Sequence, residues 1–328
     1  MRILSVILLS LFLSFSLSAA VTIKASVLAP EGTNWANNLK KMAKEIDEQT
    51  KGNVKLKVYF GGVQGDEPDV LRKIRVKQMS GGLFTGRTLG DIFGDIRVVE
   101  LPFNFKDDRA LAYKTLTGMT PFFNKGLKDK GFVNLGFFEI GLVHLVTMKE
   151  IKNLDELKGV KIWSWEGDPL AAALIQTMKL VSVPLSLPDV LGALSTGMVE
   201  AAYSPPLAIL ALQWETKIKY FVDTPVTYSI GAFLVDNATW ASIPLADQKI
   251  VEDVCRKYTD IANQATVKEN QDVMATLKNL GVKVVKFPET DTNQAQKIRA
   301  GVIEKLVGKG KLISAEALKL FDETVKKK

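Results

Sequence analysis

The sequence has very few of the residues on which hydrolases and metalloproteins depend. Its 328 residues contain one cysteine, Cys255, and one histidine, His144. A lone cysteine cannot form an internal disulfide, and together with a single histidine it cannot complete a structural zinc site. These counts also exclude Ser-His and Cys-His hydrolases unless His144 is the base. We therefore predict neither a metal site nor a cofactor.

Catalytic motifs are absent as well. The chain has no P-loop, no G-x-S-x-G, no S-x-x-K and no H-E-x-x-H sequence. His144 lies in an apolar stretch, which favours a structural imidazole over a general base. The carboxylate pairs at 66–67 and 107–108 lie beside predicted helix starts and are typical of caps. We predict that the protein is not an enzyme and has no catalytic residues.

The excess of positive charge is small and dispersed. Lys and Arg number 43 against 36 Asp and Glu, which gives a net charge of +7. The basic groups at 40–41, 72–75 and 326–328 lie far apart and among acidic residues. Because a nucleic-acid surface needs clustered basic residues, we predict no nucleic-acid partner.

A short apolar run opens the chain. Residues 3–17 are apolar apart from serines, follow Met1 and Arg2, and precede Ser18, Ala19 and Ala20. This order is typical of a secretory signal peptide, and the run is shorter than the about 20 residues of a membrane span. We predict a signal peptide over residues 1–20 and an exported mature protein that does not itself span a membrane.

Strand and helix patterns alternate in two stretches of the chain. In the first, strands are predicted at 21–29, 54–60 and 81–86, with helices at 35–50, capped by Asn34, and at 66–79. In the second, strands are predicted at 160–165, 181–185 and 200–204, with helices at 168–178 and 187–198. Such alternation indicates an α/β fold with parallel sheets.

Two strand-like segments, 132–148 and 226–235, connect these stretches. Two crossings between lobes form a hinge with a cleft that can close around a ligand. A helix from about 242 to 280 would be on the order of 50 Å long and could brace both lobes. A strand at 282–287 and helices at 291–307 and 314–325 are predicted to follow. We assign 21–140 with 230–270 to lobe I, and 141–229 with 271–328 to lobe II.

The candidate site residues follow the carboxyl ends of the predicted strands, where open α/β sheets bind ligands. They are Glu31, Trp35, Thr85, Arg87, Trp163, Trp165, Asp168, Tyr203, Ser204 and Trp214. Tryptophan supplies apolar area with a polar handle, which suits the wall of a ligand pocket. The alternatives are that the tryptophans are core residues, that Arg87 is an exposed loop residue, and that Asp168 only caps a helix.

Six segments occur in the order of a known family. They are 29–32, 60–67, 100–105, 154–163, 184–189 together with 193–200, and 240–244. In this order the chain resembles the DctP-like solute receptors of tripartite ATP-independent periplasmic (TRAP) transporters. The resemblance implies a periplasmic binding protein with two α/β lobes, two hinge strands and a long bracing helix. It also implies capture of a small organic solute by lobe closure and delivery to a membrane permease.

The chain departs from the family at the position of its carboxylate clamp. Most members carry an arginine after the Lys-Ile dipeptide, and this chain has Trp163 there. It is therefore similar to a tryptophan-bearing subgroup without the clamp, and a simple dicarboxylate is not the expected ligand. We expect a small organic ligand with an apolar or aromatic body. One such ligand would be a monocarboxylate bound through Arg87. The alternative functions are a sensor for a membrane kinase, an ABC-type receptor and an exported enzyme.

Overall fold

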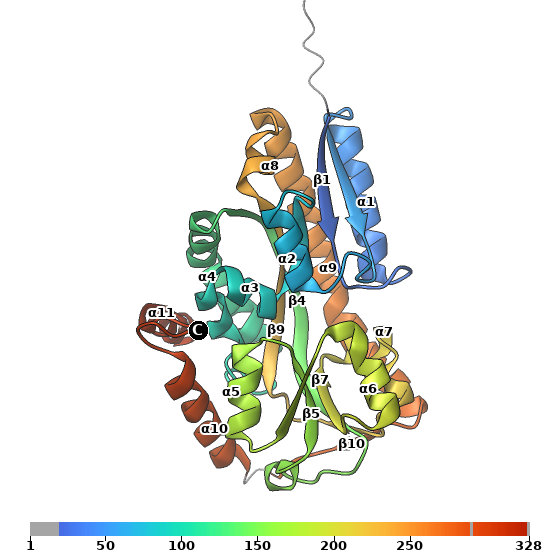
Figure 1. Cartoon of the computed structure of the whole chain (residues 1–328), viewed down its shortest axis with the longest axis vertical. Helices are drawn as coiled ribbons and strands as arrows, with labels where there is room; N and C mark the ends of the chain where they lie inside the picture. The colour runs from blue at the N-terminus through green and yellow to red at the C-terminus, as the bar shows by residue number, and fades with distance from the viewer. Residues whose placement is uncertain (1–19, 289–290, 327–328) are drawn as a thin grey trace, which may run out of the picture.

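The computed structural model describes residues 20–288 and 291–326, and its strands form a sheet that runs through two lobes (Figure 1). The strand order is β2-β1-β3-β9-β4-β7-β5-β6, with β8 paired to β4 and β10 paired to β8. Helices pack against the sheet in both lobes, which confirms the α/β architecture. The predicted signal peptide lies, apart from Ala20, outside the described residues.

The first lobe begins with two parallel crossovers. β1 (Val21–Ser26) pairs in parallel with β2 (Val54–Tyr59) and β3 (Gly81–Thr85). The connecting helices are α1 (Asn34–Gln49) and α2 (Glu67–Arg75). The carboxyl ends of β1 and β3 therefore reach the same edge of the sheet.

The helix caps differ from the sequence prediction in one case. The cap of α1 is Thr33 rather than Asn34, because Thr33 has extended backbone angles and its side chain accepts a hydrogen bond from the Ala36 N–H at 3.2 Å. Asp66 forms a capping box with Asp69 at the start of α2, which confirms its interpretation as a cap. α2 ends at Arg75, earlier than predicted.

Two long antiparallel strands link the lobes. β4 (Phe132–Thr147) pairs along most of its length with β9 (Thr227–Asp236), with register shifts at Gly136 and Gly141. A Cβ atom at Gly136 would lie 2.3 Å from Oγ1 of Thr259, so glycine is required for the close approach of a helix there. These strands occupy the segments predicted as connections.

The second lobe extends the sheet beyond β4. β7 (Ala201–Ser204) pairs antiparallel with β4 and parallel with β5 (Lys161–Trp165), which pairs in parallel with β6 (Val181–Leu185). α5 (Pro169–Thr177) follows β5, and α6 (Val190–Thr196) follows β6 after a 3-10 turn.

Shorter elements complete this lobe. They are η2 (Leu154–Leu157), η3 (Leu187–Asp189), α7 (Pro206–Ala211), η4 (Trp214–Thr216), β8 (Tyr220–Val222) and β10 (Lys283–Val285). α7 begins directly after β7 and leads into η4, so the chain doubles back at the carboxyl end of β7.

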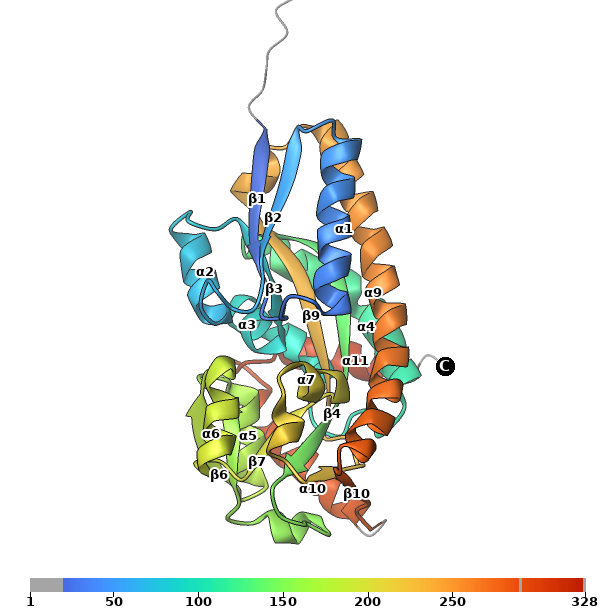
Figure 2. The ribbon, with the colours of Figure 1, turned by 90° about the vertical axis from the view of Figure 1, so that its right-hand side faces the viewer.

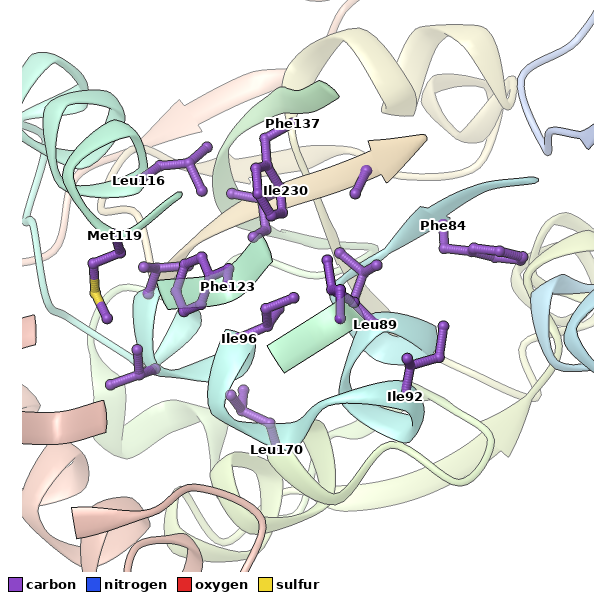
Figure 3. Packing of buried hydrophobic residues seen from close by; sticks show 14 of the residues in the cluster. Phe84, Leu89, Ile92, Ile96, Leu116, Met119, Phe123, Phe137, Leu170 and Ile230 are labelled. Atoms are coloured by element: carbon purple, nitrogen blue, oxygen red, sulfur yellow. The ribbon is translucent and has the colours of Figure 1, made fainter. Parts of the chain in front are cut away.

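Three helical elements between β3 and β4 were not predicted. They are α3 (Gly86–Ile92), η1 (Gly94–Glu100) and α4 (Arg109–Asp129). Their apolar side chains form the largest hydrophobic cluster together with residues of β9 and the C-terminal helices. Figure 3 shows part of this cluster, including Phe123 of α4, Ile96 of η1 and Ile230 of β9.

The C-terminal helices divide between the lobes. α10 (Asp291–Leu306) packs against α5, whereas α11 (Ala315–Lys326) packs against α4 and η1. The predicted division assigned 271–328 to lobe II, and the contacts of α11 instead lie with elements that follow β3. The sequence pattern identified these helices but not their partners.

One long helix runs beside both lobes (Figure 2). α9 (Leu245–Asn279) follows the short α8 (Asn237–Ala241) and contacts α1, β4 and α7. This arrangement matches the brace expected from the sequence, although Pro244 separates α8 from α9. No helix in the described ranges is long and apolar enough to cross a membrane.

Asn263 attaches α9 to the bulged part of β4. Its side chain is buried, accepts a hydrogen bond from the Glu139 N–H at 2.8 Å and donates one to the Phe137 carbonyl at 3.1 Å. These main-chain groups lie between the two register shifts in the β4–β9 ladder. The amide therefore joins the brace to the hinge strand.

Replacing this amide should destabilise the fold. Asn263→Ala leaves a buried N–H and a buried carbonyl without partners, and we expect it to lower the free energy of unfolding by about 2–4 kcal/mol in urea denaturation. The exposed neighbour Gln264 is the matched control, and Gln264→Ala should change that free energy by no more than about 0.5 kcal/mol. Equal effects of the two substitutions would contradict the assigned role.

Candidate functional site

Two neighbouring cavities lie between the lobes. The larger has a volume of about 450 Å³ and the smaller about 170 Å³. Leu28, Thr85, Ile140, Ala208 and Leu212 are among the residues that line both. The two cavities are therefore compartments of one interlobe cleft, at the carboxyl ends of β1 and β3 from one side and of β5 and β7 from the other.

The larger cavity is mostly apolar. Trp35, at the start of α1, packs on Phe138 with ring centroids 4.7 Å apart, and its Nε1–H donates to Oγ1 of Thr266 on α9 at 3.3 Å. Leu207 and Leu210 of α7 supply part of the opposite wall. The indole is thus fixed in orientation while it contributes apolar surface to the cavity.

Aromatic side chains form much of the wall of the smaller cavity. Trp163 stacks on Tyr203 with ring centroids 4.8 Å apart and meets Trp214 edge-on at 5.4 Å. Trp163 is only 2% exposed and Trp214 only 1%, so both are also core residues. The core interpretation and the cavity-wall interpretation, which the sequence presented as alternatives, both apply to these side chains.

Trp165 bridges the two lobes through its indole N–H. Nε1 donates to Oδ2 of Asp66 at 2.8 Å, and Asp66 belongs to the N-terminus of α2 in the first lobe. The main-chain N–H of Trp165 donates to the Tyr203 hydroxyl at 3.2 Å. Burial raises the pKa of Tyr203, so this hydroxyl stays protonated and can donate a hydrogen bond of its own.

Arg87 also reaches across the cleft. Its Nε and Nη2 donate to the Glu166 carbonyl at 3.1 and 2.8 Å, and its Nη1 pairs with Asp91 on the same helix. Gly167 has a φ of 72°, a backbone conformation that favours glycine, and a Cβ atom there would lie 2.6 Å from Nη2. Arg87 is therefore largely buried and is engaged by groups of the protein.

A buried arginine, Arg97 of η1, also lines the smaller cavity, and the sequence analysis did not identify it. Its Nη1 and Nη2 donate to the two carboxylate oxygens of Asp168 at 3.0 and 3.1 Å, and its Nε lies 2.7 Å from Oε2 of Glu100. All three side chains are buried. We call Arg97, Asp168 and Glu100 the buried triad.

The buried triad is anchored to the main chain at both acids. Asp168 caps α5 by accepting from the N–H groups of Leu170 and Ala171 at 2.9 and 3.3 Å, and Oε1 of Glu100 accepts from the Ile230 N–H at 3.1 Å. Burial opposes the charge of Arg97, but the two carboxylates outweigh it and raise the pKa of Arg97. Burial raises the pKa of Glu100 in spite of its arginine partner.

Glu67 is a second buried acid, and it lines the larger cavity. Both of its oxygens accept from the Thr85 N–H at 3.0 Å, and Oε2 also accepts from the Thr85 hydroxyl at 3.1 Å. Burial, with a smaller contribution from Asp66, raises the pKa of Glu67 to about 8. The carboxyl is therefore mostly protonated at neutral pH and adds little negative charge to the cleft.

The remaining candidates lie as follows. Ser204 is buried and lines the smaller cavity, whereas Glu31 is exposed, pairs with Lys40 at 3.0 Å and lines neither cavity. His144 lies outside both cavities. Its Nδ1 is 2.9 Å from the Val222 carbonyl oxygen, and its ring packs against Phe221. Burial lowers the pKa of His144, which fits the structural role predicted for it.

The titration of Glu67 gives a testable pH dependence. Its pKa in the folded protein lies above the ordinary 4.5, so its contribution to stability is present below 4.5 and is lost as the pH rises toward 8. The wild type should lose free energy of unfolding on the order of 5 kcal/mol over this range, and Glu67→Gln should abolish that loss, measured by urea denaturation at several pH values. Glu31→Gln is the control, and parallel curves for the wild type and Glu67→Gln would contradict the shift.

Comparison with known sequences identifies a family. The profile described as "DctP: Bacterial extracellular solute-binding protein, family 7" matches residues 25–309. A solute-binding protein of Verminephrobacter eiseniae is 23% identical over 275 residues, with 82% of this chain and 80% of that protein covered. The C4-dicarboxylate-binding periplasmic protein DctP of Rhodobacter capsulatus is 24% identical over 277 residues, with 83% and 82% covered.

Solved structures show the same fold. The sugar acid binding protein of Advenella mimigardefordensis in complex with galactonate superposes with a TM-score of 0.86 at 18% identity, over 94% of this chain and 98% of that chain. An extracytoplasmic solute receptor of Bordetella pertussis that binds pyroglutamic acid gives a TM-score of 0.84 at 18% identity, over 94% and 100%. The chain belongs to the DctP family of bacterial extracellular solute-binding proteins, the receptors that serve TRAP transporters.

Proposed function

We propose that this receptor binds a small organic ligand with an apolar or aromatic body in the cleft between its lobes. The observation that carries the proposal is the composition of the two cavities. Apolar side chains of α7 and β4 and the rings of Trp35, Trp163 and Trp165 are among the side chains that line them. Burial of apolar surface against such walls is the main source of affinity for a ligand of this kind.

Trp163 supports assignment to a tryptophan-bearing subgroup of the family. It occupies the position at which most members carry the clamp arginine, and its Nε1–H donates to the Leu185 carbonyl at 3.1 Å. The indole of Trp163 is 2% exposed and lines the smaller cavity, where relatives would present a guanidinium. A ligand that touches this indole gains apolar contact rather than a charge-assisted hydrogen bond.

The contacts between the lobes and the hinge strands support a receptor that captures its ligand by lobe closure. The contacts Trp165–Asp66 and Arg87–Glu166 join the lobes across the cleft, and the hinge consists of two strands that can bend at their glycines. We propose that the protein acts in the periplasm after removal of residues 1–20. It would then deliver its ligand to the permease subunits of a TRAP transporter.

A thermal-shift screen of metabolites tests this function. A true ligand at a hundred times its dissociation constant should stabilise the folded protein by about 2.7 kcal/mol. Small-angle X-ray scattering should show a decrease in the radius of gyration when the same compound is added. Disruption of the gene should abolish uptake of that compound by cells, and unchanged uptake would argue against the transport role.

Trp35 should contribute directly to affinity. Trp35→Leu removes aromatic surface from the larger cavity, and we expect it to weaken binding of the hit compound by about tenfold in isothermal titration calorimetry. Trp240 lines neither cavity, so Trp240→Leu is the matched control and should leave affinity unchanged. Equal losses for both variants would place the binding surface elsewhere.

A further inference from the structure

Among the residues that the structure describes, the smaller cavity has no lining cation that is free to bind a ligand carboxylate. Among the described residues that line it, the charged ones are Arg87, Arg97, Glu100 and Asp168. Arg97 lies between Glu100 and Asp168, and Arg87 pairs with Asp91 and donates to the Glu166 carbonyl. Each guanidinium is thus already engaged by acceptors of the protein.

The larger cavity has no cationic lining at all within the described part of the chain. Its titratable side chains are Glu67, Glu269 and Asp272, all of them acids. Glu269 accepts a hydrogen bond from Asn34 at 2.6 Å, and Asp272 pairs with Lys268 on the exposed face of α9. A ligand carboxylate placed in this compartment would meet carboxyl groups and apolar walls.

The uncharged polar groups of the smaller cavity are suited to a neutral ligand. Apart from the indole N–H groups, they are the hydroxyls of Thr85, Tyr203, Ser204, Thr227 and Ser229. A hydroxyl can donate or accept, so these groups can satisfy an amide, alcohol or carbonyl without a net charge. Burial of a carboxylate among them would carry a large desolvation penalty, because no cation is available to offset it.

Asp168 occupies the position that a ligand carboxylate would need in order to reach Arg97. Its two oxygens form a bidentate pair with the guanidinium, the geometry in which arginine recognises carboxylates. Oε2 of Glu100 lies 2.7 Å from Nε, so a second acid of the protein already faces the guanidinium. The buried triad therefore satisfies the arginine internally.

We propose that the cleft selects an uncharged ligand with an apolar body, because the buried triad already supplies Arg97 with two carboxylates. This inference rests on the proposed receptor function and specifies the class of its ligand. It departs from the monocarboxylate that the sequence suggested, because Arg87 and Arg97 are both engaged within the protein. The polar part of the ligand would be held by the hydroxyl groups of the cleft.

Matched compounds test this selectivity. Indole-3-acetate, indole-3-acetamide and tryptamine share one body and differ in charge, as do hexanoate, hexanamide and hexylamine. These triplets, within a wider panel of acids with their amides and amines, would be measured with the full-length mature protein by thermal shift and calorimetry. We expect the amides to bind at least about tenfold tighter than the corresponding acids and amines.

A substitution in the buried triad tests its role in charge selection. Asp168→Asn removes one carboxylate from Arg97, while asparagine remains a good helix cap for α5. We expect this variant to shift the preference toward acids by at least about tenfold, measured as the ratio of acid to amide affinity. Asp189 is an exposed acid that precedes α6 and lines neither cavity, so Asp189→Asn should leave the ratio unchanged.

The outcomes separate this inference from the receptor function. Tighter binding of acids or of amines by the wild type overturns the inference and leaves the receptor function intact. A panel in which no member binds counts against the receptor function itself, and the inference falls with it. An unchanged ratio in a folded Asp168→Asn variant overturns the role of the buried triad, and if that variant does not fold, the wild-type panel decides.

Discussion

The guanidinium of Arg97 joins segments that are far apart in the sequence. It pairs with Asp168 at the start of α5 and with Glu100 at the end of η1, and Glu100 in turn holds the main chain of β9. Removing one member of such a buried network leaves the others unpaired, which typically costs about 3–5 kcal/mol. The geometry of the cleft therefore depends on this network, because η1, α5 and β9 all border the smaller cavity.

The long helix α9 and the hinge strands constrain the cleft on the side of the larger cavity. α9 contacts the first lobe through α1 and the second through α7, and Asn263 fixes it to the bulge of β4. Trp35 uses the same helix as the acceptor of its indole N–H. The larger cavity is thus walled by elements that are tied to the hinge, so its shape is coupled to the angle between the lobes.

Much of the fold could be predicted from the sequence, because the alternation of apolar and polar residues is a local signal. The long helix and the hinge strands were recognised in this way. α4 was missed because Gly118, Pro121 and Gly126 interrupt its helical pattern, although packing against α11 and β4 stabilises it.

In the site, every candidate except Glu31 lines a cavity, because strand ends converge at one edge of the sheet. Arg97 could not be predicted, since it lies 71 residues from Asp168 and only the folded chain brings them together.

Gly86 leaves the space that the Glu100 carboxyl of the buried triad occupies. A Cβ atom at this position would lie 1.9 Å from Oε2 of Glu100, so even an alanine would force that side chain to move. The bare main chain at residue 86 therefore keeps the acid beside the guanidinium. A single added methyl group would displace Glu100 and leave Asp168 as the remaining carboxylate of the buried triad on Arg97.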